Sequence, residues 1–270
     1  MKLSEVTRVP LSVPAAVPTG RTNAYIIGTD PVVLVDPATP DQHLEDALSN
    51  RTVEHICVTH CHPDHVGGVA TYAERFDATV WARAGRERSF TEATGVEPDQ
   101  TFVPGETIPL ENGTLECIDA PGHTTGHVAF GLRESVDSSD EPPAAILVGD
   151  CAIADGSVAV TAPEGDMRAY LSTLRRLRTH DAQRLYPGHG PTIEAPQEVL
   201  ERLLAHRLER ERRVLVAVAG GASSPEAIVD VAYEKDVSHV FDLARATVVA
   251  HLEKLAVEGA LTWDGTRATV

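Results

Sequence analysis

One segment constrains this chain more than any other. The stretch VTHCHPDHVGG, residues 58–68, starts at the end of the apolar run HICV and brings four ligand-type side chains within six positions. Imidazole and carboxylate groups at this density are typical of a site for zinc, iron or manganese. The candidate ligands in the segment are His60, His62, Asp64 and His65.

The spacing within this segment predicts two neighbouring metal positions. Residues two apart on an extended strand point to the same side, so one metal can contact both His60 and His62. Pro63 and the glycine pair turn the chain towards a helix, which lets Asp64 and His65 converge on a second point nearby. Four side chains are too few to complete two metal sites, so further ligands are expected elsewhere.

Three later segments each place a ligand-type residue soon after an apolar run. His123 follows ECIDA, Asp150 follows ILVG and His189 follows RLY. In α/β proteins the carboxyl ends of strands are where active sites form. The full set of expected metal ligands is therefore His60, His62, Asp64, His65, His123, Asp150 and His189.

Short β-rich runs separated by turn signals occur in two successive sets and predict two α/β halves. The nearly continuous apolar character of VVLVDPA and HICVTH is expected of strands buried on both faces. These patterns leave the strand order open. Strand runs are expected at 22–28, 32–40, 53–60, 78–83, 107–122, 127–134, 144–153 and 182–190, helices at 41–50 and 166–180, and an acidic solvated loop at 135–143.

The residue pattern of the sequence changes after residue 196. Amphipathic helical patterns follow, and the Asp-Gly pair within ALTWDGTRATV is a strong hairpin signal. Helices followed by a hairpin predict a small winged-helix-like domain at 197–270, behind a catalytic domain at 1–196. The helical patterns lie at 198–221, 223–236 and 239–260.

Charge argues against a nucleic-acid reader in this C-terminal region. From residue 221 onward acidic residues outnumber basic ones, whereas a helix that reads a DNA groove needs several cations. We therefore expect no binding of duplex DNA. A lid, a packing role or a homodimer contact is the expected use of this region.

The order H-C-H-P-D-H, P-G-H, G-D and P-G-H-G along the chain resembles the metallo-beta-lactamase superfamily. The resemblance covers roughly residues 20–195 and implies a four-layer αβ/βα sandwich of two similar halves, an α/β fold. It also implies which ligands share a metal. His60, His62 and His123 would hold the first ion, Asp64, His65 and His189 the second, and Asp150 would bridge them.

The cofactor that the resemblance implies is a pair of zinc ions, with manganese or iron as alternatives. Two divalent ions a few ångströms apart lower the pKa of a bridging water and clamp attacking and leaving oxygens. Hydrolysis is therefore expected, with a bridging hydroxide attacking a carbonyl carbon or a phosphorus. Asp64 and Asp150 are the expected catalytic residues, and Asp150 would orient the hydroxide.

Two further residues match positions of the family. Asp36 is either a residue that orients ligands through hydrogen bonds or a simple turn residue at a strand end. His127 is expected to make a supporting hydrogen bond instead of binding metal. The other histidines are expected at the surface or in packing: His43, His55, His180, His206, His239 and His251.

The substrate is left open by the resemblance. Residues 188–191, GHGP, depart from the G-H-E-Y form common in glyoxalase II-type thioesterases, the hydroxyacylglutathione hydrolases. The P-G-H-G-P form and the C-terminal helices look more like the beta-lactamase-like protein 2 subgroup. Some members of that subgroup are single-strand endoribonucleases and others act in thioester hydrolysis. Single-stranded RNA and a small acyl ester or thioester are thus equal expectations.

Two other classes compete with hydrolysis. Mono-iron persulfide dioxygenases of the same superfamily keep similar histidines, but the complete second set of Asp64, His65 and His189 favours two metals. A non-catalytic binding protein built on the fold is disfavoured because every ligand position is intact.

Composition indicates the salt conditions and the cellular location in which the protein is expected to work. The 40 acidic residues against 23 basic ones give a net charge of −17, which resembles proteins adapted to concentrated intracellular salt, with an ordinary acidic cytosolic enzyme as the alternative. This charge disfavours long-range capture of nucleic acid. Four cysteines and an amino terminus without a signal-peptide pattern favour a cytoplasmic location. No apolar run approaches the roughly 20 residues of a membrane span.

Overall fold

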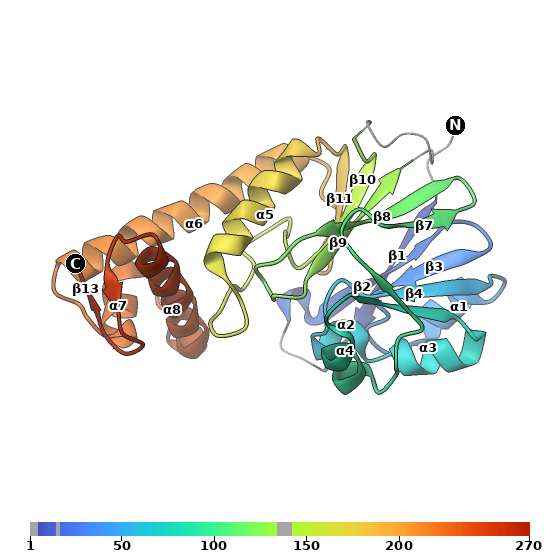
Figure 1. The fold of residues 1–270 in the computed structure, drawn as a ribbon, viewed down its shortest axis with the longest axis horizontal. Helices are drawn as coiled ribbons and strands as arrows, with labels where there is room; N and C mark the ends of the chain where they lie inside the picture. The colour runs from blue at the N-terminus through green and yellow to red at the C-terminus, as the bar shows by residue number, and fades with distance from the viewer. Residues whose placement is uncertain (1–4, 15–16, 134–141) are drawn as a thin grey trace.

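The structure is a computed structural model that describes residues 5–14, 17–133 and 142–270. Figure 1 shows a main body of two sheets with helices outside them, and a helical C-terminal region that extends away along the long helix α6 (Pro196–Ala219). Most of the predicted acidic loop at 135–143 lies outside the described residues. None of the helices in the described ranges combines the length and apolarity that a membrane crossing requires.

The first half of the chain forms a six-stranded sheet in sequence order. Its first three strands pair antiparallel, and the pairs from the third to the sixth strand are parallel. A 3-10 turn, η1 (Pro18–Gly20), precedes the second strand. The strands are β1 (Val6–Ser12), β2 (Arg21–Ile27), β3 (Val32–Val35), β4 (Val53–Cys57), β5 (Thr79–Arg83) and β6 (Gln100–Phe102).

Four helices cover the outer face of this sheet. Tyr72 and Phe90 on two of them pack with Leu34 and Ile56 of the sheet in one apolar core. The helices are α1 (Gln42–Leu48), α2 (Pro63–Val66), α3 (Val69–Phe76) and α4 (Glu87–Thr94).

The second half forms a five-stranded sheet in the order β11-β10-β9-β8-β7. Only β10 and β11 pair in parallel within it, and the other pairs are antiparallel. Helix α5 (Met167–Thr179) and the start of α6 pack on its outer face. The strands are β7 (Thr107–Leu110), β8 (Gly113–Asp119), β9 (Val128–Arg133), β10 (Ala145–Gly149) and β11 (Arg184–Pro187).

The two sheets face each other across a core of their own. Alternation along β3 explains how one strand serves two cores: Val32 and Leu34 point to the helices, while Val33 and Val35 point to the other sheet. Side chains of the second sheet, such as Phe130 and Leu147, pack in the same core. Helices, sheet, sheet and helices therefore form four layers, and the predicted αβ/βα sandwich is confirmed.

Helix α6 belongs to two cores. Leu200 and Leu203 near its start pack against the second sheet, whereas Val214 and Ala217 near its end pack within the C-terminal region. The division at residues 196 and 197 and the winged-helix assignment stay predictions. This region contains α7 (Pro225–Ala232), η2 (Ser238–Val240), α8 (Phe241–Val257) and the antiparallel pair β12 (Thr262–Trp263) and β13 (Ala268–Thr269).

The core between the sheets should respond to truncation far more than the surface does. Val33→Ala removes two methyl groups from a side chain that is 2% exposed, so we expect the free energy of unfolding in urea to fall by about 2 kcal/mol. The matched control Val103→Ala changes a side chain that is 52% exposed and should shift it by less than about 0.5 kcal/mol. Equal losses in both variants would contradict the inter-sheet core.

Candidate metal centre

The structure brings all seven predicted ligands to one edge of the sandwich. The segment after β4 carries His60 and His62, and the adjoining short helix α2 carries Asp64 and His65. The second half contributes from the ends of three strands. His123 lies between β8 and β9, Asp150 directly follows β10, and His189 follows β11.

Three imidazole nitrogens converge in the first group. Nε2 of His60 lies 2.9 Å from Nδ1 of His62, and Nε2 of His123 lies 3.0 Å from the same atom. This is the trio that the resemblance assigned to the first metal. Its members come from both halves of the chain, so the group depends on the packing of the two sheets.

The second group surrounds Asp64 and Asp150. Oδ2 of Asp64 lies 3.6 Å from Nε2 of His65 and 3.4 Å from Nε2 of His189. Asp150 reaches both groups, because its carboxylate oxygens lie 3.4 Å from Nε2 of His65, 3.3 Å from that of His189 and 3.6 Å from that of His123. Asp150 therefore stands where a bridging ligand would be required.

Each imidazole also makes a hydrogen bond to a group that is not one of the seven candidate ligands. These bonds determine which ring nitrogen is unprotonated and faces the centre. Nδ1 of His123 lies 2.7 Å from the carbonyl of Ala159, and Nδ1 of His189 lies 2.8 Å from that of Arg21. A carbonyl only accepts, so each Nδ1 carries the proton and each Nε2 presents a lone pair to the centre. On His62 the arrangement is reversed: Nε2 lies 3.1 Å from the Glu164 carboxylate, which leaves Nδ1 facing inwards.

Asp36 determines which ring nitrogen is protonated in the remaining two imidazoles, those of His60 and His65. Its carboxylate accepts from the backbone N–H and the hydroxyl of Thr59, both at 2.7 Å, and from Nδ1 of His65 at 2.9 Å. The Thr59 hydroxyl donates its hydrogen to Asp36. The hydroxyl oxygen therefore accepts a hydrogen bond from Nδ1 of His60 at 3.0 Å. Asp36 is thus a residue that orients ligands, and the alternative of a simple turn residue is wrong.

The site fits divalent cations on two observations. The bare nitrogens of His60, His62 and His123 face one another at hydrogen-bond distance, and a shared cation relieves that repulsion. In addition, the buried atoms Nε2 of His65 and Oδ1 of Asp150 have no hydrogen-bond partner among the described residues. Buried polar atoms normally have one, so these two are explained by a ligand between them. Imidazole and carboxylate ligands suit zinc, manganese or iron.

The electrostatics of the site favour cations. Burial and the neighbouring histidines hold the pKa of His60 well below its usual range, which keeps its imidazole neutral as metal binding requires. At His65 burial acts in the same direction, but Asp150 and Asp36 outweigh it and raise the pKa well above its ordinary value. Burial opposes the ionised form of Asp150, yet His65 and His189 hold the pKa of its carboxyl well below the usual range. Positive charge is therefore favoured between His65 and Asp150.

Glycines make room for this crowding. A Cβ on Gly188 would lie 2.4 Å from Oδ1 of Asp150, and one on Gly149 would lie 2.6 Å from Oγ1 of Thr59. Both positions need glycine for close approach, which gives the G-D and P-G-H-G segments a physical reason.

Sequence reasoning missed several supporting residues. Thr59 and Glu164 hold ligands as described, and the hydroxyl of Thr22 donates to Oδ2 of Asp64 at 3.2 Å. His127 was expected to support and not to ligate, and its Nε2 indeed accepts from the backbone N–H of Asp150 at 3.0 Å. The position of Thr59 beside His60 is the one signal that the sequence offered.

Comparison with known proteins decides the family. The profile of the metallo-beta-lactamase superfamily matches residues 17–137. A beta-lactamase-like protein 2 homolog from Caenorhabditis elegans is 31% identical over 79% of this chain and 71% of its own length. The chain belongs to the metallo-beta-lactamase superfamily.

Two further proteins extend the comparison. An atrochrysone carboxyl ACP thioesterase from Aspergillus fumigatus is 30% identical over 73% of this chain and 59% of its own length. The crystal structure of a metallo-beta-lactamase family protein from Thermus thermophilus superposes with a TM-score of 0.76 over 98% of both chains, at 23% identity. The superposition therefore includes the C-terminal helical region of this chain.

Removing the charge of Asp36 should weaken metal binding without deleting a ligand. In Asp36→Asn the amide cannot accept from Thr59 and His65 as the carboxylate does, so we expect zinc affinity to fall about 10- to 100-fold. Competition with a chromophoric chelator measures this. The exposed Asp230→Asn serves as the matched control, and unchanged affinity in Asp36→Asn would refute the orienting role.

The number of bound ions tests the two-group geometry directly. Protein purified without added metal should contain two divalent ions per chain, and His189→Ala should retain only the one held by the three-histidine group. Elemental analysis of the dialysed protein gives the count. The exposed His43→Ala is the control and should keep both ions. A single iron in the unmodified protein, with oxygen uptake, would instead support the persulfide dioxygenase class.

Proposed function

We propose that this superfamily member hydrolyses acyl thioesters with two divalent metal ions, zinc in the first instance. The observation that carries the hydrolase assignment is Asp150, whose carboxylate lies within 3.6 Å of imidazoles from both ligand groups. The thioester substrate is supported by the fungal relative whose name is that of a thioesterase. Manganese and iron are alternative metals with the same ligand set.

The chain's own residues prepare the centre for hydrolysis. A pair of divalent ions, when bound, lowers the pKa of a water and polarises the group under attack. Burial of His60, His65 and His189 excludes other water, which strengthens electrostatic interactions at the centre. Asp150 and Asp64 supply the carboxylate oxygens that can accept a hydrogen bond from the attacking water and fix its direction.

A groove beside the centre supports a substrate with an extended, partly apolar arm. Its volume is about 610 Å³, and it lies between α6, α8 and residues 157–159. Val237 and Leu243 give it apolar walls, and Ala159 belongs both to this groove and to a small cavity lined by His123, Asp150 and His189. Ligand pockets of this size and character are typical of small-molecule sites. An acyl chain or a pantetheine arm fits that description.

Single-stranded RNA is the second candidate because arginines line the same groove. Those arginines are already engaged, however. Arg207 donates to the carbonyl of Val158, and the Arg210 guanidinium lies 3.5 Å above the Tyr233 ring and donates to a carbonyl. Arg213 pairs with Glu209 and Glu234. Together with the net charge of −17, this favours the thioester.

A side-by-side assay separates the two substrates. The zinc-loaded protein, in high salt, should hydrolyse butyryl-coenzyme A and leave a single-stranded RNA oligonucleotide intact. His62→Ala removes the shared nitrogen of the first group and should lower the thioester rate at least about 100-fold, while His43→Ala should not. RNA cleavage that disappears in His62→Ala, without thioester turnover, would overturn the choice of substrate. Activity that persists in His62→Ala would place the reaction at another site.

A further inference from the structure

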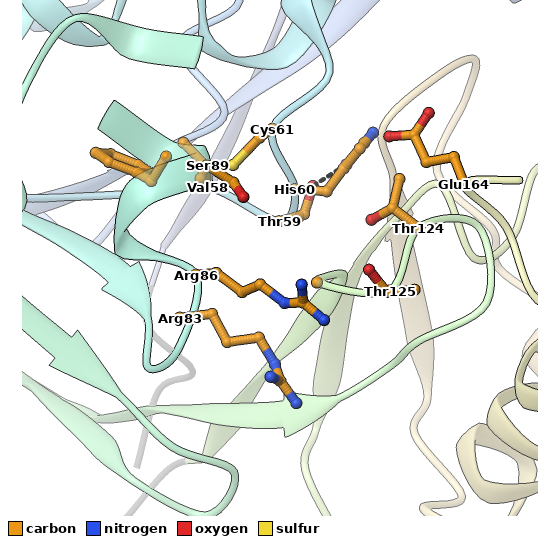
Figure 2. Close-up of a pocket in the computed structure, with 12 residues that line it drawn as sticks. Val58, Thr59, His60, Cys61, Arg83, Arg86, Ser89, Thr124, Thr125 and Glu164 are labelled. Carbon is orange, nitrogen blue, oxygen red and sulfur yellow. Dashed lines mark hydrogen bonds between the residues drawn. The ribbon is translucent and has the colours of Figure 1, made fainter. Parts of the chain in front are cut away.

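A second cavity, with lining residues that the groove does not share, lies against His60. Its volume is about 120 Å³, enough for a small polar group. One wall comes from β5 and the start of α4, and the opposite wall comes from residues 124–126 before β9. Figure 2 shows the Arg86 side chain reaching from the α4 side towards Thr125. The cavity thus lies between the two halves of the molecule.

The two arginines of this cavity differ in their partners. Arg83 forms an ion pair with Asp119, with 2.5 Å between the guanidinium nitrogen and the carboxylate oxygen. Arg86 has no side-chain hydrogen bond or ion pair among residues 5–14, 17–133 and 142–270. A guanidinium in a partly buried position is a strong site for a planar or tetrahedral anion, which it can bind through two parallel hydrogen bonds.

The position of Arg86 is fixed by packing along its stem. A Cβ on Gly126 would lie 3.4 to 3.6 Å from Cγ, Cδ and Nε of Arg86, so this stem runs over the Gly126 backbone. The hydroxyls of Thr124, Thr125 and Ser89 also line the cavity and can donate to an anion.

The cavity also contains one carboxylate, that of Glu164, which does not pair with Arg86. The Glu164 carboxylate lines the same cavity, but it is bound to Nε2 of His62. In Figure 2 Glu164 and Arg86 lie on opposite sides of His60. One end of the cavity is therefore cationic and the other anionic, and only the Arg86 end can take a negative group.

We propose that Arg86 binds a negative group of the substrate, a carboxylate or a phosphate, while the scissile bond lies at the metal centre. This inference rests on the proposed thioester hydrolysis and adds a substrate class: thioesters that carry an anion. A local cation is needed for this purpose, because a molecule with a net charge of −17 otherwise repels anions. The anion can belong to the acyl group or to the thiol leaving group.

Two pairs of substrates distinguish these sources. Succinyl- and butyryl-N-acetylcysteamine differ by a carboxylate on the acyl group, and butyryl-phosphopantetheine and butyryl-N-acetylcysteamine differ by a phosphate on the thiol. In Arg86→Met, which keeps an apolar stem, the ratio of kcat/KM for the anionic to the neutral member of one pair should fall about 10- to 100-fold. Arg86→Lys should restore part of that ratio.

The matched control is Arg88→Met, two residues after Arg86 in the first turn of α4. The Arg88 side chain is 91% exposed and pairs with Glu92, so this variant removes the same charge two residues further along the chain and outside the cavity. Both substrate ratios should stay at the unmodified values in Arg88→Met. Ratios unchanged by Arg86→Met in both pairs, or lowered equally by Arg88→Met, would overturn the proposal.

A binding measurement keeps this inference separate from the proposed function. Calorimetric titration of the zinc-loaded protein with sulfate and with acetate, at constant ionic strength, reports anion binding without turnover. Affinity for one of them should fall at least about five-fold in Arg86→Met and not in Arg88→Met. If no thioester is hydrolysed but this loss is found, the thioester proposal fails and the anion site stands. If thioesters are hydrolysed but sulfate and acetate bind equally to all three proteins, the anion site fails alone.

Discussion

The geometry of the metal centre depends on one buried carboxylate, that of Asp36. It is 1% exposed and accepts three hydrogen bonds, two from Thr59 and one from His65. A buried charge is tolerated only when it is bonded in this way, so the Asp36 network cannot relax without a large cost. Through Thr59 it also reaches His60, and one residue thereby aims a ligand of each metal group. Asp36 itself takes a left-handed φ of 51° directly after β3.

The centre also requires that the two halves keep their relative position. His123, Asp150 and His189 follow strands of the second sheet, whereas the other four candidate ligands lie after β4 of the first sheet. Besides the apolar core between the sheets, β2 holds the other half directly: Asn23 and Tyr25 donate to the carbonyl of Pro187 at 2.8 and 2.6 Å. These bonds act next to His189, so they transmit the packing of the first sheet to a ligand of the second.

The sequence allowed the candidate ligands to be nominated because five of them come soon after an apolar strand, Asp64 and His65 lie on the short helix that follows β4, and two adjoin a glycine that close approach requires. His189 after Gly188 and Asp150 after Gly149 are examples. Their partners could not be predicted in the same way. Glu164 is about a hundred residues from His62 in the chain, and Ala159 reaches His123 through a backbone carbonyl that any residue offers. The strand order likewise depended on tertiary packing, which local patterns do not encode.

The C-terminal region contributes to the centre without supplying any of the seven ligands. Arg202 on α6 donates to the carbonyls of Ile153 and Ala154, and Arg207 donates to that of Val158. These bonds hold the segment that ends at Ala159, whose carbonyl fixes the imidazole of His123. Arg202 and Arg207 of α6 thus hold the backbone of the segment that follows β10. The arginines that line the groove beside the centre, Arg207, Arg210 and Arg213, are therefore all engaged by carbonyl or carboxylate oxygens and offer little free positive charge to a polyanion. The guanidinium of Arg86 has no such partner among the described residues, so it can bind a single charged group.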